Sequence, residues 1–171
     1  MPLLSAEELR TRLGRDLPGA VLEAAPLQIV PPAHGSKGPF VTTDVLVEPT
    51  RLLDAALYLR DQVGYTYLSD IAVVDYLTDN LLEVVYRFYH LDGGPSLALK
   101  VRLPRENPEL ASLTPHWPGA NFHEREAYDL YGVVFTGHPF LRRIYMWDEF
   151  EGFPMRKDFP KQGDKYIGAE E

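Results

Sequence analysis

The chain has 171 residues, a length that suits one domain and is short for two. Its 17 Lys and Arg against 25 Asp and Glu give a formal net charge of −8, which argues against a general nucleic-acid binder because phosphates need basic partners. The absence of cysteine excludes a disulfide, a cysteine nucleophile, and a cysteine-held zinc or iron–sulfur centre on this chain.

No segment has the pattern of a signal peptide or a membrane span. Glu7 and Glu8 stand where a signal peptide would carry positive charge. The longest uncharged stretch, residues 24–36, is shorter than the roughly 20 residues of a spanning helix and contains three prolines. We therefore expect a soluble, intracellular chain that reaches a membrane only through a partner.

The first third of the chain predicts one helix and several short strands. Ser5 and Glu8 match a capping box, so a helix is expected to begin there and to end near Gly14. Short strands are expected at residues 21–23 and 27–30 and a longer one at 41–47, with an exposed loop at 31–39.

The middle of the chain predicts a helix followed by a meander of strands. Thr50 is expected to cap a helix that Gly64 closes. Apolar and β-branched runs then predict strands at residues 65–68, 71–77, 81–90 and 97–103, with a hairpin turn at 91–96. This order predicts an α+β domain with a mostly antiparallel sheet and helices on one face.

A second capping box, at Asn121 and Glu124, predicts a helix that Gly132 ends. Apolar residues fall on nearly every side of this helix, so we expect neighbours in several directions and partly enclosed charges. Arg125 and Asp129 are four residues apart and are expected to pair, with Glu126 beside Arg125.

Four interpretations of this acidic helix are open. A metal site is disfavoured because Ala127 stands where the zinc-protease helix pattern needs a second histidine; the candidate ligands are His123, Glu124, Glu126, Asp129 and His138. Acid–base catalysis by Glu124 with Glu126 is disfavoured because the two point to different faces. A solvated charge run is the third interpretation. We favour the fourth, a buried charged network where two subunits meet.

Residues 124–132, EREAYDLYG, resemble the signature of the C-type (thirty-kilodalton) subunit of the proton-pumping NADH:quinone oxidoreductase, respiratory complex I. The similarity continues through residues 137–139, 141–144 and 152–159, and upstream through 68–71 and 75–77. Two positions depart from the family pattern. The family has His or Trp where this chain has Phe153, and Leu where it has Met155. The first 44 residues carry no family signal.

The resemblance implies a non-catalytic, cofactor-free scaffold subunit of the peripheral arm. The complex would carry FMN, iron–sulfur clusters, NADH and quinone on other subunits. The implied partners are chiefly the D-type subunit and the neighbouring cluster-bearing subunits. The implied location is the cytoplasmic face of the cell membrane, with the chain peripheral. Consistent with this, the sequence has no dinucleotide-binding glycine motif and no phosphate loop.

Residues 138–171 predict an extended partner-binding tail that follows a globular part at 1–137. Seven aromatic residues make this tail too aromatic for a typical disordered segment, yet it lacks helical or strand periodicity. We expect Arg142, Arg143, Arg156 and Lys157 to bond carboxylates or carbonyls of partners. The alternative is that the tail packs back on its own sheet. The whole predicted interface motif is Glu124, Arg125, Glu126, Tyr128, Asp129, Gly132, His138, Pro139, Arg142, Arg143, Arg156, Lys157 and Asp158.

Two alternative functions remain. The chain could serve a related complex, such as the ferredoxin-driven photosynthetic type, a deazaflavin-dependent dehydrogenase or a membrane-bound hydrogenase. It could also be a stand-alone hydrolase that uses His123 or His138 with Glu124.

Overall fold

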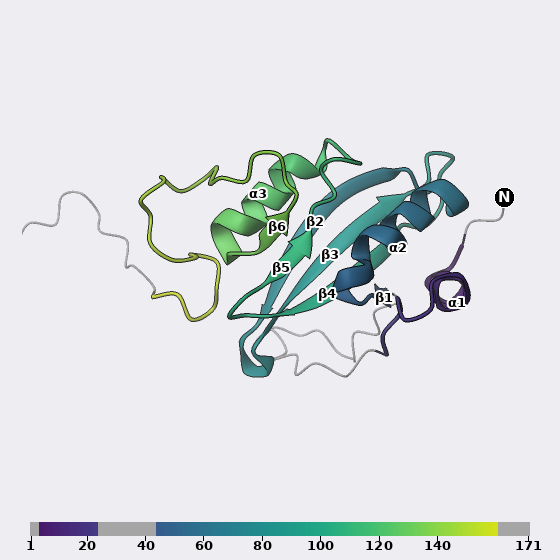
Figure 1. Ribbon diagram of the computed structural model, residues 1–171, viewed down its shortest axis with the longest axis horizontal. Helices are drawn as coiled ribbons and strands as arrows, with labels where there is room; N and C mark the ends of the chain where they lie inside the picture. The colour runs from purple at the N-terminus through teal and green to yellow at the C-terminus, as the bar shows by residue number, and fades with distance from the viewer. Residues whose placement is uncertain (1–3, 24–43, 161–171) are drawn as a thin grey trace, which may run out of the picture.

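The computed structural model describes residues 4–23 and 44–160 of the chain (Figure 1). The α-helices and strands are α1 (Ala6–Asp16), β1 (Val45–Leu46), α2 (Leu52–Tyr58), β2 (Tyr67–Tyr76), β3 (Leu81–Tyr89), β4 (Leu97–Pro104), β5 (Glu109–Ala111), α3 (Ala120–Tyr131) and β6 (Val134–Thr136). Three short helical turns flank them: η1 (Pro49–Arg51), η2 (Leu59–Val63), which is a π-helical turn, and η3 (Leu77–Asp79).

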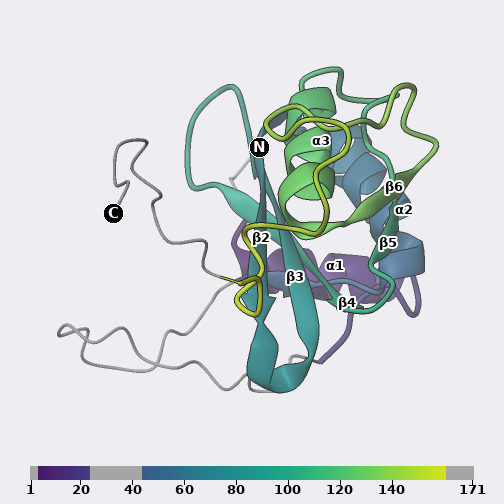
Figure 2. The same ribbon diagram turned by 90° about the vertical axis from the view of Figure 1, so that its left-hand side faces the viewer.

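The main sheet has the strand order β1-β4-β3-β2. The strands β2, β3 and β4 form an antiparallel meander, and β1 pairs in parallel with β4. A small parallel sheet of β5 and β6 lies beside it. Helices α2 and α3 cover the same side of the main sheet (Figure 2). The predicted α+β class with helices on one face is confirmed, with one parallel strand added.

The hydrophobic core lies between this sheet and helix α2. Alternate residues of β3, such as Leu82, Tyr86 and Phe88, are fully buried on the helix side, as the two-residue period of a strand requires. Leu52 and Leu59 from α2 and η2 belong to the same cluster. The sequence predicted two strands where β2 is one, because a bulge between Leu68 and Asp70 interrupts the alternation without ending the strand.

Some helix ends lie where the sequence predicted them, and others do not. The capping box of Ser5 and Glu8 is present, but α1 continues past Gly14 to Asp16. Gly64 ends the second helical segment at φ 87°, as predicted. Thr50 makes no capping bond, because the chain enters that segment through a 3-10 turn that begins at Pro49. Helix α3 begins at Ala120, so the predicted cap residue Asn121 lies inside the helix.

The short strands were the least predictable elements. The predicted strand at 21–23 is a single bridge from Val21 to Val47, and the described part of the predicted strand at 41–47 reduces to β1. The strand and loop predicted at 27–30 and 31–39 lie outside the described residues. Strands β5 and β6 were not predicted, because three residues are too few to show a period.

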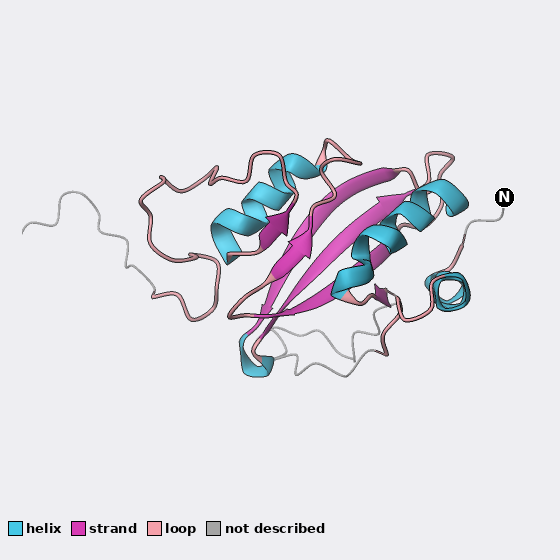
Figure 3. Ribbon diagram, viewed as in Figure 1, coloured by secondary structure: helices cyan, strands magenta, loops and turns pink. Residues whose placement is uncertain are grey.

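After β6 the chain forms a long irregular loop, drawn in pink in Figure 3, that passes beside helix α3. We call residues 138–160 the C-terminal loop. No helix among the described residues is long and apolar enough to cross a membrane.

Candidate functional site

Helix α3 carries the predicted motif and packs against strand β2. Glu124 and Asp129 are fully buried, whereas Phe122 near the start of the helix is 67% exposed. Two charged side chains of this helix are therefore enclosed by the rest of the chain, as the residue pattern predicted. The two buried carboxylates have different partners and hold different parts of the chain.

Asp129 holds the first half of the C-terminal loop. Its Oδ2 accepts the backbone N–H groups of Ile144 (2.9 Å), Tyr145 (2.7 Å) and Met146 (3.0 Å), and its Oδ1 accepts Nη1 of Arg143 (2.7 Å). Burial alone would raise the pKa of Asp129, but the hydrogen bonds from these four donors hold it below its ordinary value. The carboxylate thus accepts hydrogen bonds from three consecutive backbone N–H groups and from one guanidinium of the loop.

Arg143 extends the same contact further along the loop. Its guanidinium also donates to the carbonyls of Asp129 (2.8 Å), Phe150 (3.0 Å) and Gly152 (3.0 Å). One side chain therefore ties the end of α3 to two points of the loop that are close together in sequence. The planar, multi-donor guanidinium suits this role better than a lysine ammonium would.

The predicted pair between Arg125 and Asp129 is wrong. Arg125 donates instead to the carbonyls of Arg142 (3.2 Å) and Arg143 (3.4 Å). Its partners lie in the loop because Asp129 is already saturated by loop donors. Of the other predicted residues, Glu126 and Tyr128 are half-buried, and Pro139 is exposed.

A second contact fastens the far end of the loop to strand β2. Arg105 binds Asp75 through Nε (2.8 Å) and Nη2 (3.0 Å), and it binds Asp158 through Nη2 (2.6 Å) and Nη1 (3.1 Å). The N–H of Lys157 also donates to Asp75 (2.8 Å). The hydrogen bonds from Arg105 lower the pKa of Asp158. Sequence reasoning missed Arg105, since it lies far from Asp158 along the chain and no local pattern joins them.

A third contact joins the end of α3 to the middle of the loop. Met155 N–H donates to the carbonyl of Leu130 (3.1 Å), and Arg156 Nε donates to that of Tyr131 (2.7 Å). Gly132 ends the helix at φ 78°, and a Cβ there would lie 2.5 Å from the ring of Phe153. Only glycine satisfies both the left-handed backbone and this close approach.

The other buried carboxylate, Glu124, faces the segment between β5 and α3. It accepts the hydroxyls of Ser112 and Thr114 (2.9 Å) and the N–H of Leu113 (2.6 Å). His138 lies 4.0 Å away. Within the described ranges, no three His, Asp or Glu side chains come together as metal ligands.

The loop held by these contacts presents large apolar side chains to solvent. Phe140, Tyr145, Trp147 and Met155 are each more than half exposed. Trp147 packs edge-on against Phe150, with ring centroids 4.9 Å apart. We use the name aromatic surface for the set Phe140, Tyr145, Trp147, Phe150 and Met155.

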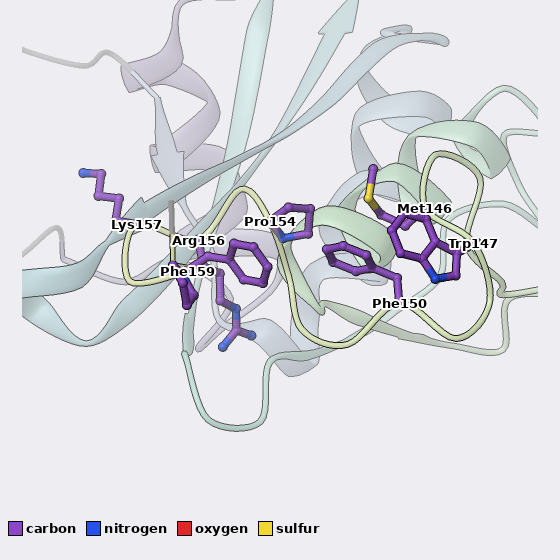
Figure 4. Close-up of a pocket in the computed structure, with 8 residues that line it drawn as sticks. Met146, Trp147, Phe150, Pro154, Arg156, Lys157 and Phe159 are labelled. Atoms are coloured by element: carbon purple, nitrogen blue, oxygen red, sulfur yellow. The ribbon is translucent and has the colours of Figure 1, made fainter. Parts of the chain in front are cut away.

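Part of the aromatic surface borders an open hollow of about 700 Å³ (Figure 4). Its lining is Met146, Trp147, Phe150, Pro154, Arg156, Lys157, Phe159 and Pro160. The side chain of Lys157 points away from the aromatic rings. Among the predicted basic residues, Arg143 and Arg156 bond within the chain. Arg142 stacks over Phe140, with its guanidinium 4.3 Å from the ring centroid.

Comparison with known proteins identifies the family. The model of the respiratory-chain NADH dehydrogenase 30 kDa subunit matches residues 45–165, more than half of the chain. The C-type subunit of NADH-quinone oxidoreductase from Roseiflexus sp. (strain RS-1) is 44% identical over 130 residues, which are 74% of this chain and 71% of that protein. The C-type subunit from Moorella thermoacetica is 45% identical over 123 residues, which are 71% of this chain and 83% of that protein.

Two solved structures share the fold. A trypsin-resistant fragment (1–134) of Nqo5 superimposes with a TM-score of 0.51 at 35% identity, over 57% of this chain and 83% of the fragment. A chain of the archaeal membrane-bound sulfane sulfur reductase superimposes with a TM-score of 0.64 at 20% identity, over 91% of this chain and 85% of its own length. The matching family model and the two sequence relatives show that the chain belongs to the family of the 30 kDa subunit of the respiratory-chain NADH dehydrogenase.

Proposed function

We propose that this chain is a non-catalytic scaffold subunit in the peripheral arm of an NADH:quinone oxidoreductase. Family membership supports the assignment to the complex. In this proposal, other subunits carry the FMN, the iron–sulfur clusters and the sites for NADH and quinone. This chain supports electron transfer by holding its neighbours in place.

The scaffold role is supported mainly by the exposed side chains of the aromatic surface. Large apolar groups exposed together on one segment usually mark a protein contact, and aromatic residues are enriched among residues that dominate binding energy. The contacts of Asp129, Arg143 and Arg105 hold the loop that bears them. A loop ordered in this way loses less conformational entropy on binding than a free tail would.

We propose the D-type subunit as the chief partner of this surface, with a cluster-bearing subunit next to it. Arg142 and Lys157 are exposed, and their side chains are available for carboxylates or carbonyls of that partner. The complex would hold the chain on the cytoplasmic face of the cell membrane.

The direct test is purification of the full chain, tagged at its N-terminus, from detergent-solubilised membranes of its host. We expect NADH-binding, cluster-bearing and D-type subunits to co-purify in equal amounts. A photo-cross-linker at Tyr145 should form its main adduct with the D-type subunit, whereas one at Glu7, on α1, should not. Recovery of the chain alone, or with unrelated proteins, would contradict the proposal.

A related complex is a second candidate, because the same fold occurs in the archaeal sulfane sulfur reductase. The co-purified subunits decide between the two, since a complex that accepts electrons from NADH contains a flavin subunit with an NADH site. The hydrolase alternative has no support from the geometry. Glu124 and His138 have fully buried side chains that a substrate does not reach.

A further inference from the structure

Arg156, which lines the hollow beside the aromatic surface, is held in one orientation by its own chain. Its Nε donates to the carbonyl of Tyr131 at 2.7 Å. Its guanidinium carbon lies 4.8 Å from the centroid of the Phe153 ring. A guanidinium that is fixed at Nε presents its two terminal Nη groups as a planar fork, and such a fork can bind a carboxylate through two hydrogen bonds.

The positive charge of Arg156 is only partly compensated by the described residues around it. Asp75 and Asp158 attract it from a distance, but both form their ion pairs with Arg105, at 2.8 Å and 2.6 Å. Burial and the positive charge of Arg105 together lower the pKa of Arg156 below its ordinary value. An anion at the Nη groups would therefore stabilise this guanidinium.

The rest of the hollow is mainly apolar. Its volume of about 700 Å³ is that of a small-molecule pocket, so it accommodates a few side chains rather than a whole helix. The rings of Phe150 and Phe159 stack with their centroids 5.8 Å apart. In Figure 4, Arg156 lies next to Phe159, and Trp147 lies at the opposite end. A molecule that fills the hollow must have an apolar part for the rings and a negative group for Arg156.

Three acidic residues of the C-terminal loop restrict the source of that negative group. Asp148, Glu149 and Glu151 are all exposed. They repel a continuous anionic surface, such as a membrane of acidic lipids, once it comes within a Debye length of about 8 Å at physiological ionic strength. A single carboxylate bonded directly to Arg156 is less affected, because the charge-assisted bond is short. An acidic side chain of a protein therefore fits better than lipid headgroups.

We propose that the hollow receives an Asp or Glu of the partner subunit together with an apolar residue next to it. The carboxylate accepts two hydrogen bonds from the Nη groups of Arg156, and the apolar residue packs against Trp147, Phe150 and Phe159. The hollow adjoins the exposed side chains of the aromatic surface, so one partner covers both. This inference rests on the proposed scaffold function and adds the chemistry of the partner segment.

Photo-cross-linking in the intact complex tests what occupies the hollow. The full tagged chain carries a photoreactive phenylalanine analogue at Phe159, membranes are irradiated, and mass spectrometry locates the adduct. We expect the adduct in a peripheral-arm subunit, at a segment where an Asp or Glu adjoins an apolar residue. No adduct, an adduct with lipid or with residues 161–171 of this chain, or an adduct at a segment without an acidic residue would overturn the proposal.

A double-mutant cycle tests the pairing of Arg156 with that acid. Arg156→Gln also removes the bond to Tyr131, but this effect on the loop is the same with either form of the partner and cancels in the cycle. We expect Arg156→Gln, and replacement of the cross-linked acid by its amide, each to lower recovery of that subunit at least about tenfold, as for close interfacial charge pairs. The double variant should lose little more than either single one.

The matched control is Arg12→Gln, which removes an exposed arginine of helix α1 and should leave recovery unchanged. Losses that multiply in the double variant would overturn the pairing. Recovery of the complete complex with either contradictory result would refute this inference alone. Recovery of the chain without the other subunits would refute the scaffold function, and this inference with it.

Discussion

Asp129 and Arg143 form an ion pair of 2.7 Å between the buried face of helix α3 and the C-terminal loop. The Asp129 side chain is fully buried and that of Arg143 is 14% exposed. The two lie fourteen positions apart in the sequence, so the pair closes a loop rather than stabilising one helix. This loop carries the aromatic surface, and the ion pair therefore connects the fold to the proposed partner contact.

Replacing Asp129 should release the loop without a partner being present. Asp129→Ala removes the only carboxylate partner of Arg143 among the described residues and leaves three backbone N–H groups without their acceptor. Breaking a buried pair costs about 3–5 kcal/mol. We expect the amides of Ile144, Tyr145 and Met146 to exchange at least about a hundredfold faster, as measured by hydrogen exchange. Asp148→Ala, an exposed acid in the same loop, should have almost no effect. Unchanged exchange at all three amides would show that Asp129 does not hold the loop.

The two acidic partners of Arg105 should differ in their contribution to stability. Asp75 is buried and accepts three hydrogen bonds, whereas the side chain of Asp158 is 53% exposed. Asp75→Ala should lower the free energy of unfolding by about 3–5 kcal/mol, and Asp158→Ala by about 1 kcal/mol or less. Urea denaturation of the two variants measures this difference. Equal losses would mean that Asp75 is not enclosed.

Gly132 should tolerate a methyl group less well than Gly137. Both have positive φ, 78° and 79°, but a Cβ at Gly132 would meet the ring of Phe153 at 2.5 Å, and one at Gly137 would meet nothing within 4 Å. Gly137→Ala should cost about 1 kcal/mol through backbone strain alone. Gly132→Ala should cost at least about 1 kcal/mol more, because the ring must also move, and Phe153→Leu should recover part of the difference. Thermal unfolding measures each variant, and equal costs would contradict a close approach of Phe153 to Gly132.

Stability should fall in acid partly through Asp129. In the folded chain the pKa of Asp129 lies below its ordinary value of 3.8. Its contribution to the free energy of unfolding is therefore complete above pH 3.8. As pH falls through the lower folded pKa, the carboxylate takes up a proton and the contribution is lost. Urea midpoints should therefore drop steeply below about pH 4, and the drop should be shallower in Asp129→Asn. Parallel curves for the two proteins would contradict this explanation.

The sequence predicted the antiparallel meander well, because β2, β3 and β4 are long enough to show alternation and turn residues separate them. It also placed Gly132 at a helix end and indicated that the helix charges are enclosed. Both features depend on residues that are close in sequence.

The partners of those charges could not be predicted in the same way. Arg143 reaches Asp129 across a loop, and Arg105 meets Asp158 from a distant part of the chain. Helical spacing instead favoured Arg125 for Asp129, which is wrong because Asp129 accepts from Arg143 and from three backbone N–H groups of the loop. Long-range pairs depend on the path of the chain, and no local pattern encodes that path.

A double substitution tests most directly whether the aromatic surface attaches this subunit to its complex, as we propose. Tyr145→Ala with Trp147→Ala removes two exposed rings that lie outside the hydrophobic core, so circular dichroism and thermal unfolding should stay unchanged. Val74→Ala, an exposed apolar residue on β2, is the control. We predict that the wild type and the control co-purify with the other peripheral-arm subunits from membranes and that the double variant loses at least about tenfold in recovery. Equal recovery of the subunits with a folded double variant would contradict the claim.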